Sequence, residues 1–192
     1  MYSVQDYEES FDLFDYIIDG NRTGGGIPES IIRNIFLQVL RGVNHLHSNG
    51  VCHRDLKLEN ILLVKKDCSI KLIDFGFVGP VAGRDKCGKL TTFVGTQVYM
   101  APELLSGNIS DGYNGQACDI FALGIILFVL TVQSCFPFRD ANQFDPSYRY
   151  LWSYDAESFW DQSPWKNFEI STEMKDLITC MLTVDPSIRF GM

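Results

Sequence analysis

The spacing of hydrophobic and polar residues predicts a mainly helical chain with two long helices. Over residues 28–48, apolar side chains recur every three or four positions, with Pro28 in the first turn and Gly50 as a left-handed stop. The stripe that we expect to be buried consists of Ile32, Phe36, Val39, Leu40, Val43 and Leu46. Residues 119–132 are apolar on every side, which predicts a helix buried all round.

Shorter patterns predict the remaining elements. Residues 12–18 carry a short amphipathic helical pattern, and residues 156–161 and 171–182 predict two further helices. Residues 60–64 and 69–73 read as strands around a lysine-rich turn, so we expect a short β hairpin.

Two stretches lack such periodicity. Residues 74–103 are rich in Gly, Thr and Lys, and an irregular stretch of this length inside a compact domain is usually functional. The run Gly24-Gly25-Gly26 invites a phosphate-loop interpretation. It has neither G-x-G-x-x-G nor G-x-x-x-x-G-K spacing and follows no strand, so a link between two helices is the better interpretation.

Composition narrows the class of protein. The 192 residues are 46% hydrophobic, enough for one domain, or one large lobe, with a substantial core. A net charge of -8 argues against nucleic acid as a partner. The apolar run at residues 120–132 is shorter than the roughly 18 to 20 residues of a bilayer span, so we expect no membrane partner.

The cysteines and histidines do not form a metal-binding pattern. Six scattered cysteines without a C-x-x-C pair or a signal peptide predict reduced thiols and an intracellular protein, cytoplasmic or also nuclear. His45 and His47 could be taken as a metal pair. Residues two apart on a helix point to different faces, so cap and packing roles are the better interpretation.

The strongest chemical signal is His53-Arg54-Asp55-Leu56-Lys57-Leu58-Glu59-Asn60, followed by Asp74-Phe75-Gly76. A carboxylate that can accept a proton, with Asn and Asp oxygens for a hard divalent cation, suits phosphoryl transfer. With these motifs the chain resembles the C-terminal lobe of a eukaryotic Ser/Thr protein kinase. Leu56 to Asn60 is similar to the calcium/calmodulin-dependent and AMP-activated, SNF1-like groups.

The resemblance implies the fold and the catalytic residues. The fold would be mainly α, the C-terminal lobe of the protein-kinase-like fold with a short β hairpin at the catalytic cleft. Asp55 would be the catalytic base, and Lys57 would neutralise charge on the transferring phosphoryl group. Asn60 and Asp74 would bind Mg²⁺.

It also implies the binding of ATP and of a protein substrate. Asp6 and Glu8 lie in the stretch that would contact adenine, and Leu62 would support adenine from below. Asp12 would contact the ribose or a substrate cation, and Glu59 would receive a substrate arginine.

Regulation would involve Arg54 and Thr92. An upstream kinase would phosphorylate Thr92, whose phosphate would pair with Arg54, and Thr91 is the competing site. Thr96 would hydrogen-bond to Asp55 and Lys57 beside the substrate.

Other residues would support this site. His53 would stack on Phe75, and Asp119 would anchor the 53–60 stretch through its backbone N–H groups. Glu103 would form a buried ion pair with Arg189.

The sequence lacks the family's glycine-rich loop and its phosphate-binding strand lysine. We therefore expect residues 1–192 to be a partial kinase domain, from the end of the fifth strand and the hinge to the last-but-one helix. Two hypotheses follow: the C-lobe of an active Ser/Thr kinase, inactive alone, or an inactive kinase-derived module for protein interaction or substrate docking. Either way, an exposed apolar upper face is expected.

Overall fold

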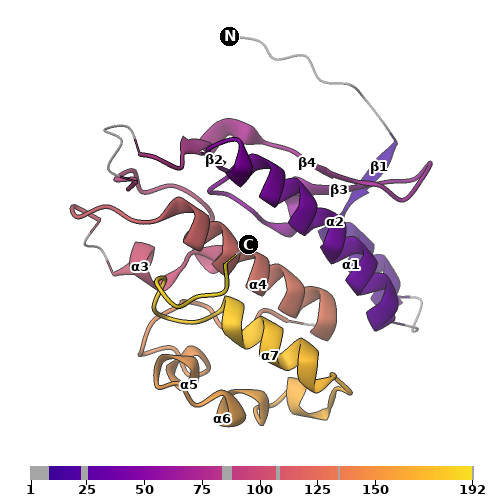
Figure 1. Ribbon diagram of the computed structural model, residues 1–192. Helices are drawn as coiled ribbons and strands as arrows, with labels where there is room; N and C mark the ends of the chain where they lie inside the picture. Colours follow the sequence, from indigo (N-terminus) through magenta and orange to yellow (C-terminus); the bar gives the residue numbers. More distant parts are fainter. Residues whose placement is uncertain (1–8, 23–25, 84–87, 107–108, 134, 192) are drawn as a thin grey trace.

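The computed structural model describes residues 9–22, 26–83, 88–106, 109–133 and 135–191. Small sheets and helix α2 lie along one side of the molecule, above the central helix α4 (Figure 1). Helix α7 and the short helices α5 and α6 lie below α4. This helix-rich architecture with small sheets is the one that the hydrophobic pattern predicts.

A three-stranded antiparallel sheet lies next to the candidate site, because β3 directly follows the 53–60 stretch. Its order is β1 (Ser10–Asp12), β3 (Ile61–Val64) and β4 (Ile70–Leu72). The pair β3–β4 confirms the predicted hairpin. The helix predicted over residues 12–18 is present as α1 (Leu13–Arg22), but it begins one residue later and ends four residues later. Asp12 instead ends β1 and caps α1, where the N–H of Asp15 donates to its Oδ1 at 2.8 Å.

Helix α2 (Glu29–Ser48) follows the predicted pattern with small differences. Pro28 is the residue before the helix rather than part of its first turn, and Gly50 ends it at φ 75°. Leu40 and Leu46 are only half-buried, whereas Ile35 and His47 are buried. A second small sheet follows, in which β2 (Val51–Cys52) pairs with β5 (Gly79–Pro80).

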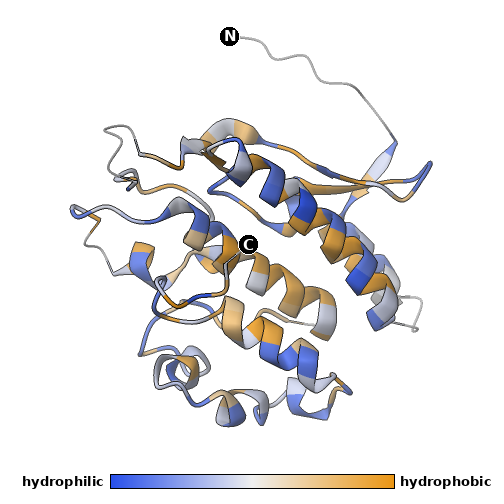
Figure 2. Cartoon of the chain, in the orientation of Figure 1, coloured by the Kyte–Doolittle hydropathy of each residue, from blue (hydrophilic) through white to orange (hydrophobic). Residues whose placement is uncertain are grey.

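Helix α4 (Gly115–Val132) is the centre of the core. It begins four residues earlier than predicted, because the side chain of Asn114 accepts from the N–H groups of Gln116 and Ala117. Its 18 residues are long and apolar enough to cross a membrane, but 83% of them are buried inside the protein. The prediction that this helix is too short to span a membrane was therefore wrong, and it is the burial of the helix that argues against a span. Figure 2 shows the hydrophobic residues along this helix.

The remaining elements connect and close the core. Helices α3 (Pro102–Leu105), α6 (Ala156–Trp160) and α7 (Thr172–Met181, capped by Ser171) surround α4, and α5 (Tyr148–Trp152) was not predicted. Single turns form η1 (Leu58–Asn60), η2 (Phe75–Phe77), η3 (Gln97–Tyr99) and η4 (Trp165–Asn167). The described part of residues 74–103 has only short elements, as its composition predicts.

Candidate active site

The 53–60 stretch is held in place by a buried carboxylate of α4. Asp119, which is 1% exposed, accepts the backbone N–H of His53 at 2.9 Å and that of Arg54 at 2.8 Å. This contact confirms the predicted anchor. Arg54 has φ 69°, a left-handed conformation that is unfavourable for an arginine, and the two bonds to Asp119 stabilise this turn.

His47 is a third partner of this carboxylate, and the sequence interpretation missed its role. Its Nε2 lies 2.8 Å from Asp119 Oδ2, and the histidine is buried. The available signal was its spacing, because His47 continues the buried series Val39 and Val43 at intervals of four.

The atoms of His47, Cys52 and Asp119 that could bind a metal lie within 4.8 Å of one another. Both Asp119 oxygens already accept N–H groups, and burial raises the pKa of the Cys52 thiol to about 12. These contacts make the His47–Asp119 pair a structural anchor of the 53–60 stretch.

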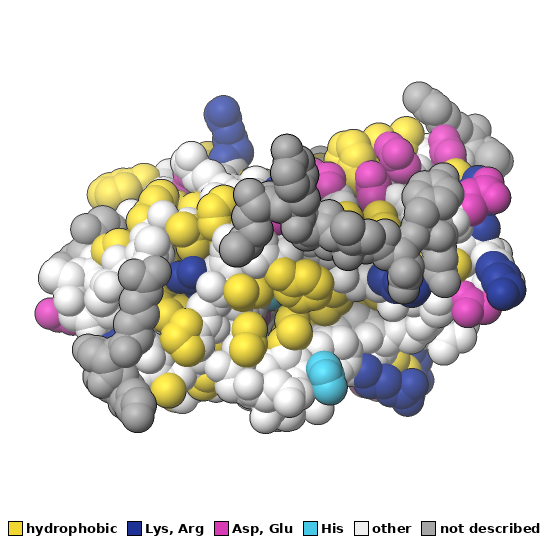
Figure 3. All heavy atoms as spheres, turned by 90° about the horizontal axis from the view of Figure 1, so that it is seen from above, with side chains coloured by type: hydrophobic (Ala, Val, Ile, Leu, Met, Phe, Trp, Pro, Cys, Tyr) yellow, Lys and Arg dark blue, Asp and Glu magenta, His cyan; other side chains and the backbone are white. Residues whose placement is uncertain are grey.

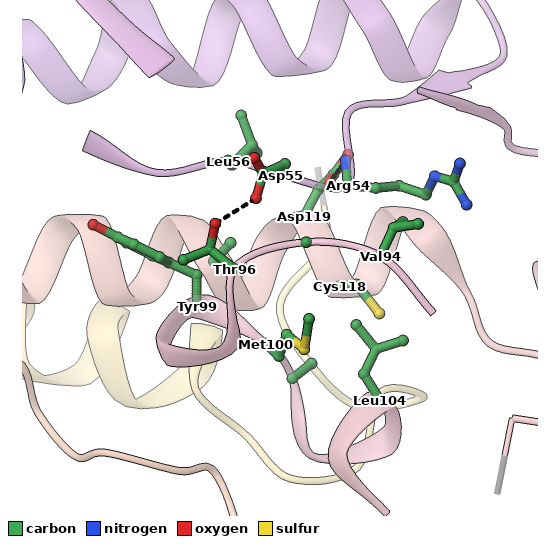
Figure 4. A pocket seen from close by; sticks show the side chains of 13 residues that line it. Arg54, Asp55, Leu56, Val94, Thr96, Tyr99, Met100, Leu104, Cys118 and Asp119 are labelled. Carbon is green, nitrogen blue, oxygen red and sulfur yellow. Dashed lines mark hydrogen bonds between the residues drawn. The ribbon is translucent and has the colours of Figure 1, made fainter. Parts of the chain in front are cut away.

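Asp55 lies at the centre of a polar cluster. The hydroxyl of Thr96 donates to Asp55 Oδ1 at 2.8 Å (Figure 4). Lys57 Nζ lies 3.0 Å from Asp55 Oδ2. Lys57 also donates to Thr96 Oγ1 at 3.2 Å, so the three side chains form a closed triangle. Asn60 Nδ2 donates to the backbone oxygen of Asp55 at 2.8 Å and lies 3.3 Å from its Oδ2.

Asp55 and Thr96 line a small cavity of about 20 Å³ between the 53–60 stretch, residues 94–101 and the start of α4 (Figure 4). Asp55 is 4% exposed, and a buried carboxylate must have partners because its desolvation is costly. The structure thus brings together the predicted residues Asp55, Lys57, Asn60 and Thr96.

Asp74 follows β4 and caps η2. Its φ is 59°, and its Oδ1 accepts the N–H of Gly76 at 3.2 Å. The ring centroids of Phe75 and His53 lie 5.3 Å apart, which confirms the predicted contact, but the rings are tilted by 52° rather than stacked in parallel. The Nε2 of His53 is 3.1 Å from the backbone oxygen of Ile73, so this histidine ties the 53–60 stretch to the residue before Asp74.

Oxygen donors suited to a divalent cation are present here. The amide nitrogen of Asn60 donates to Asp55, so the side-chain oxygen of Asn60 is the atom that could bind a cation. The Asp74 carboxylate is exposed. Mg²⁺ prefers such hard oxygen ligands, so the donor set of Asn60 and Asp74 fits this ion.

Arg54 connects three segments. Its Nε donates to the backbone oxygen of Phe77 at 2.5 Å, its Nη2 to that of Val78 at 3.2 Å, and its Nη1 to the Tyr113 hydroxyl at 3.3 Å. Thr92 is exposed and lines the same pocket of about 250 Å³ as Arg54. Tyr113 is a second residue that the sequence interpretation missed.

The comparisons with known proteins agree with this geometry. The family model described as protein kinase domain matches residues 1–192. The chain belongs to the protein kinase domain family. It is 38% identical over 192 residues to CBL-interacting protein kinase 26 of Oryza sativa subsp. japonica, and 35% identical over 193 residues to SNF-related serine/threonine-protein kinase of Homo sapiens. All of this chain is covered in both comparisons, but it spans only 35% and 23% of those two kinases' lengths.

In the three-stranded sheet of this kinase domain, Asp12 and Leu62 are partners across the β1–β3 ladder. Leu62 is half-buried, and Asp12 uses one oxygen to cap α1. Glu59 is exposed in η1. The predicted positions Asp6 and Glu8 lie outside the described residues.

A long-range ion pair between Glu103 and Arg189 joins the start of α3 to the C-terminal part of the described chain. Arg189 Nη1 and Nη2 donate to the two carboxylate oxygens of Glu103 at 2.8 and 2.9 Å, across 86 positions of sequence. This geometry confirms the predicted pair. Cys118 lies against it, donating from Sγ to Glu103 Oε1 at 3.4 Å.

Proposed function

We propose that this chain is the C-lobe of a protein serine/threonine kinase, which transfers the γ-phosphate of ATP to a protein hydroxyl. The observation that carries the proposal is the triangle of Asp55, Lys57 and Thr96. It combines a nearly buried carboxylate, an ammonium 3.0 Å away and a hydroxyl that donates to the same carboxylate. These are the groups that position an acceptor hydroxyl and the charge that develops around it.

In this proposal Asp55 orients the acceptor hydroxyl and takes its proton. The hydroxyl oxygen bonds to the γ-phosphorus, the bond from that phosphorus to the β–γ bridging oxygen breaks, and ADP leaves. The bond from Thr96 fixes the Asp55 carboxylate, and the Lys57 ammonium offsets negative charge on the transferring group. The proton stays on Asp55 until the product leaves.

Asn60 and Asp74 would hold Mg²⁺ through their side-chain oxygens. When bound, this ion neutralises charge on the ATP phosphates. Asp6, Glu8 and Leu62 would contact adenine, and Asp12 would contact the ribose or, with Glu59, an arginine of the substrate. The groups that grip the phosphates from above, a glycine-rich loop and its partner lysine, would come from outside these 192 residues.

An inactive docking module is the alternative. The observation in its favour is the exposed apolar surface, which includes Phe75, Phe77 and Val78. Figure 3 shows hydrophobic side chains gathered on the face seen from above, the side of the strands and α2 in Figure 1. The closed triangle at Asp55 favours the kinase, because docking needs neither its Lys57 nor its Thr96.

The test is a transfer assay on the full-length protein that contains this chain. The protein is incubated with radiolabelled ATP, Mg²⁺ and three peptide pools in which Ser, Thr or Tyr is the sole acceptor. We expect label in the Ser and Thr pools, and its loss when EDTA removes Mg²⁺. Label in the Tyr pool alone would contradict the acceptor class, and no label in any pool after treatment with an upstream kinase would favour the docking module.

A further inference from the structure

Tyr113 lies where the chain enters α4 and is attached to the 74–103 segment by its backbone. The N–H of Leu90 donates to the Tyr113 carbonyl at 2.9 Å, and the N–H of Tyr113 donates back to Leu90 at 2.8 Å. The tyrosine is 5% exposed. This antiparallel bridge therefore fixes residue 90 against a buried side chain at the start of the central helix.

The hydroxyl of Tyr113 makes two further contacts. It donates to the backbone oxygen of Thr92 at 2.8 Å and accepts from Arg54 Nη1 at 3.3 Å. Burial raises the pKa of the Tyr113 phenol, so at neutral pH the hydroxyl keeps the proton that it donates to Thr92. One oxygen thus joins the Thr92 backbone to the Arg54 side chain.

Arg54 extends this connection to the metal side of the site. Its other donors bind the backbone oxygens of Phe77 and Val78, which follow Asp74-Phe75-Gly76 by one and two residues. The path from Thr92 through Tyr113 and Arg54 to residues 77 and 78 consists only of hydrogen bonds between described residues. It exists with an unmodified Thr92 side chain.

We propose that Tyr113 is a positioning residue whose hydroxyl couples the Thr92 backbone to Arg54, and through Arg54 to the segment after Asp74. This rests on the proposed function, in which Thr92 and Arg54 are the regulatory pair. A phosphate on Thr92 gives Arg54 a charged acceptor of its own. The Tyr113 hydroxyl therefore matters most before phosphorylation, and the phosphate then replaces part of its contribution.

The test uses Tyr113→Phe in the full-length protein, which removes the hydroxyl and keeps the ring. We expect faster amide exchange over residues 88–94 in the unphosphorylated variant. We also expect about a fivefold lower kcat/KM before phosphorylation, the low end of measured couplings, and a loss of less than about twofold after Thr92 is phosphorylated.

Tyr148→Phe is the matched control. Tyr148 is fully buried, and its hydroxyl donates to a backbone oxygen, that of Leu182, at 3.1 Å. This variant should leave exchange at residues 88–94 unchanged, whatever it does to overall stability.

Unchanged exchange in Tyr113→Phe, or the same fold loss of kcat/KM in both phosphorylation states, would overturn the proposal. Amide exchange does not require catalysis. If the wild-type protein transfers no phosphate, the proposed function fails while exchange still decides the role of Tyr113.

Discussion

At the scale of single residues, two buried carboxylates organise the site. Asp119 accepts from two backbone N–H groups and from His47, and Asp55 is surrounded by Lys57, Thr96 and Asn60. Leaving one such carboxylate without partners would cost several kcal/mol. The partners of Asp119 and Asp55 therefore hold both carboxylates in place.

The sequence was enough to find the residues of the motifs but not all of their partners. Asp55, Lys57 and Asn60 lie close together in the chain, so their spacing alone suggests a shared role. His47 lies 72 positions from Asp119, and Arg54 lies 59 from Tyr113. No local pattern connects residues so distant. His47 meets Asp119 because α2 packs against α4, and Tyr113 meets Arg54 through the hydrogen bond to its hydroxyl.

The side chain of Thr92 gives the first prediction at this scale. Thr92→Ala keeps the backbone oxygen that Tyr113 binds, so the fold should be unaffected. Activity after treatment with an upstream kinase should fall about tenfold or more, because each lost charge-assisted bond is worth about 1.5–3 kcal/mol. Thr91→Ala, at an equally exposed neighbour, should stay close to wild type in the same peptide assay. The reverse order would identify Thr91 as the regulatory site.

At the scale of secondary structure, the long patterns predicted well. Of the short elements, the β3–β4 hairpin and α6 were predicted, whereas β1 and α5 were not. Helices α2, α4 and α7 were found because their apolar positions repeat over several turns. Strand β1 has three residues and α5 has five, too few for a period to be visible. The start of α4 was missed because Asn114, a polar cap, lies before the apolar run.

Close packing between α4 and α7 depends on Gly124. A Cβ at this position would lie 2.9 Å from Met181 Cβ and 3.0 Å from Leu182 Cδ2. Alanine is favoured over glycine in a helix by about 1 kcal/mol, but overpacking a core costs about 1–3 kcal/mol. The cost of overpacking should exceed the gain in helix propensity, because Met181 Cβ is bonded to the backbone and cannot move aside on its own.

We therefore expect Gly124→Ala to lower the free energy of unfolding in a urea titration. Gly42→Ala is the control, since its Cβ would meet only the flexible side chain of Leu72, with Cδ1 at 3.1 Å and Cγ at 3.4 Å. It should be neutral or stabilising. A Gly124→Ala protein at least as stable as wild type would show that α4 and α7 separate easily.

At the scale of the whole molecule, the hydrogen bonds of Arg189 join segments that lie far apart in the sequence. Arg189 donates to Glu103 and also to the backbone oxygens of Ala117, Thr183 and Val184. These contacts join α3, α4 and the end of α7. The family resemblance predicted the ion pair with Glu103, but only the structure reveals the backbone oxygens that share the same guanidinium.

The most direct measurement is phosphoryl transfer by the full-length protein with Asp55→Asn. The amide keeps the shape of the side chain but has lost most of its ability to accept a proton, so the rate should fall about a hundredfold to ten-thousandfold. Asp67→Asn, on the exposed β3–β4 turn, should transfer at the wild-type rate. A wild-type rate in Asp55→Asn, or an equal fall in both variants, would contradict the role of Asp55 and with it the proposed kinase site.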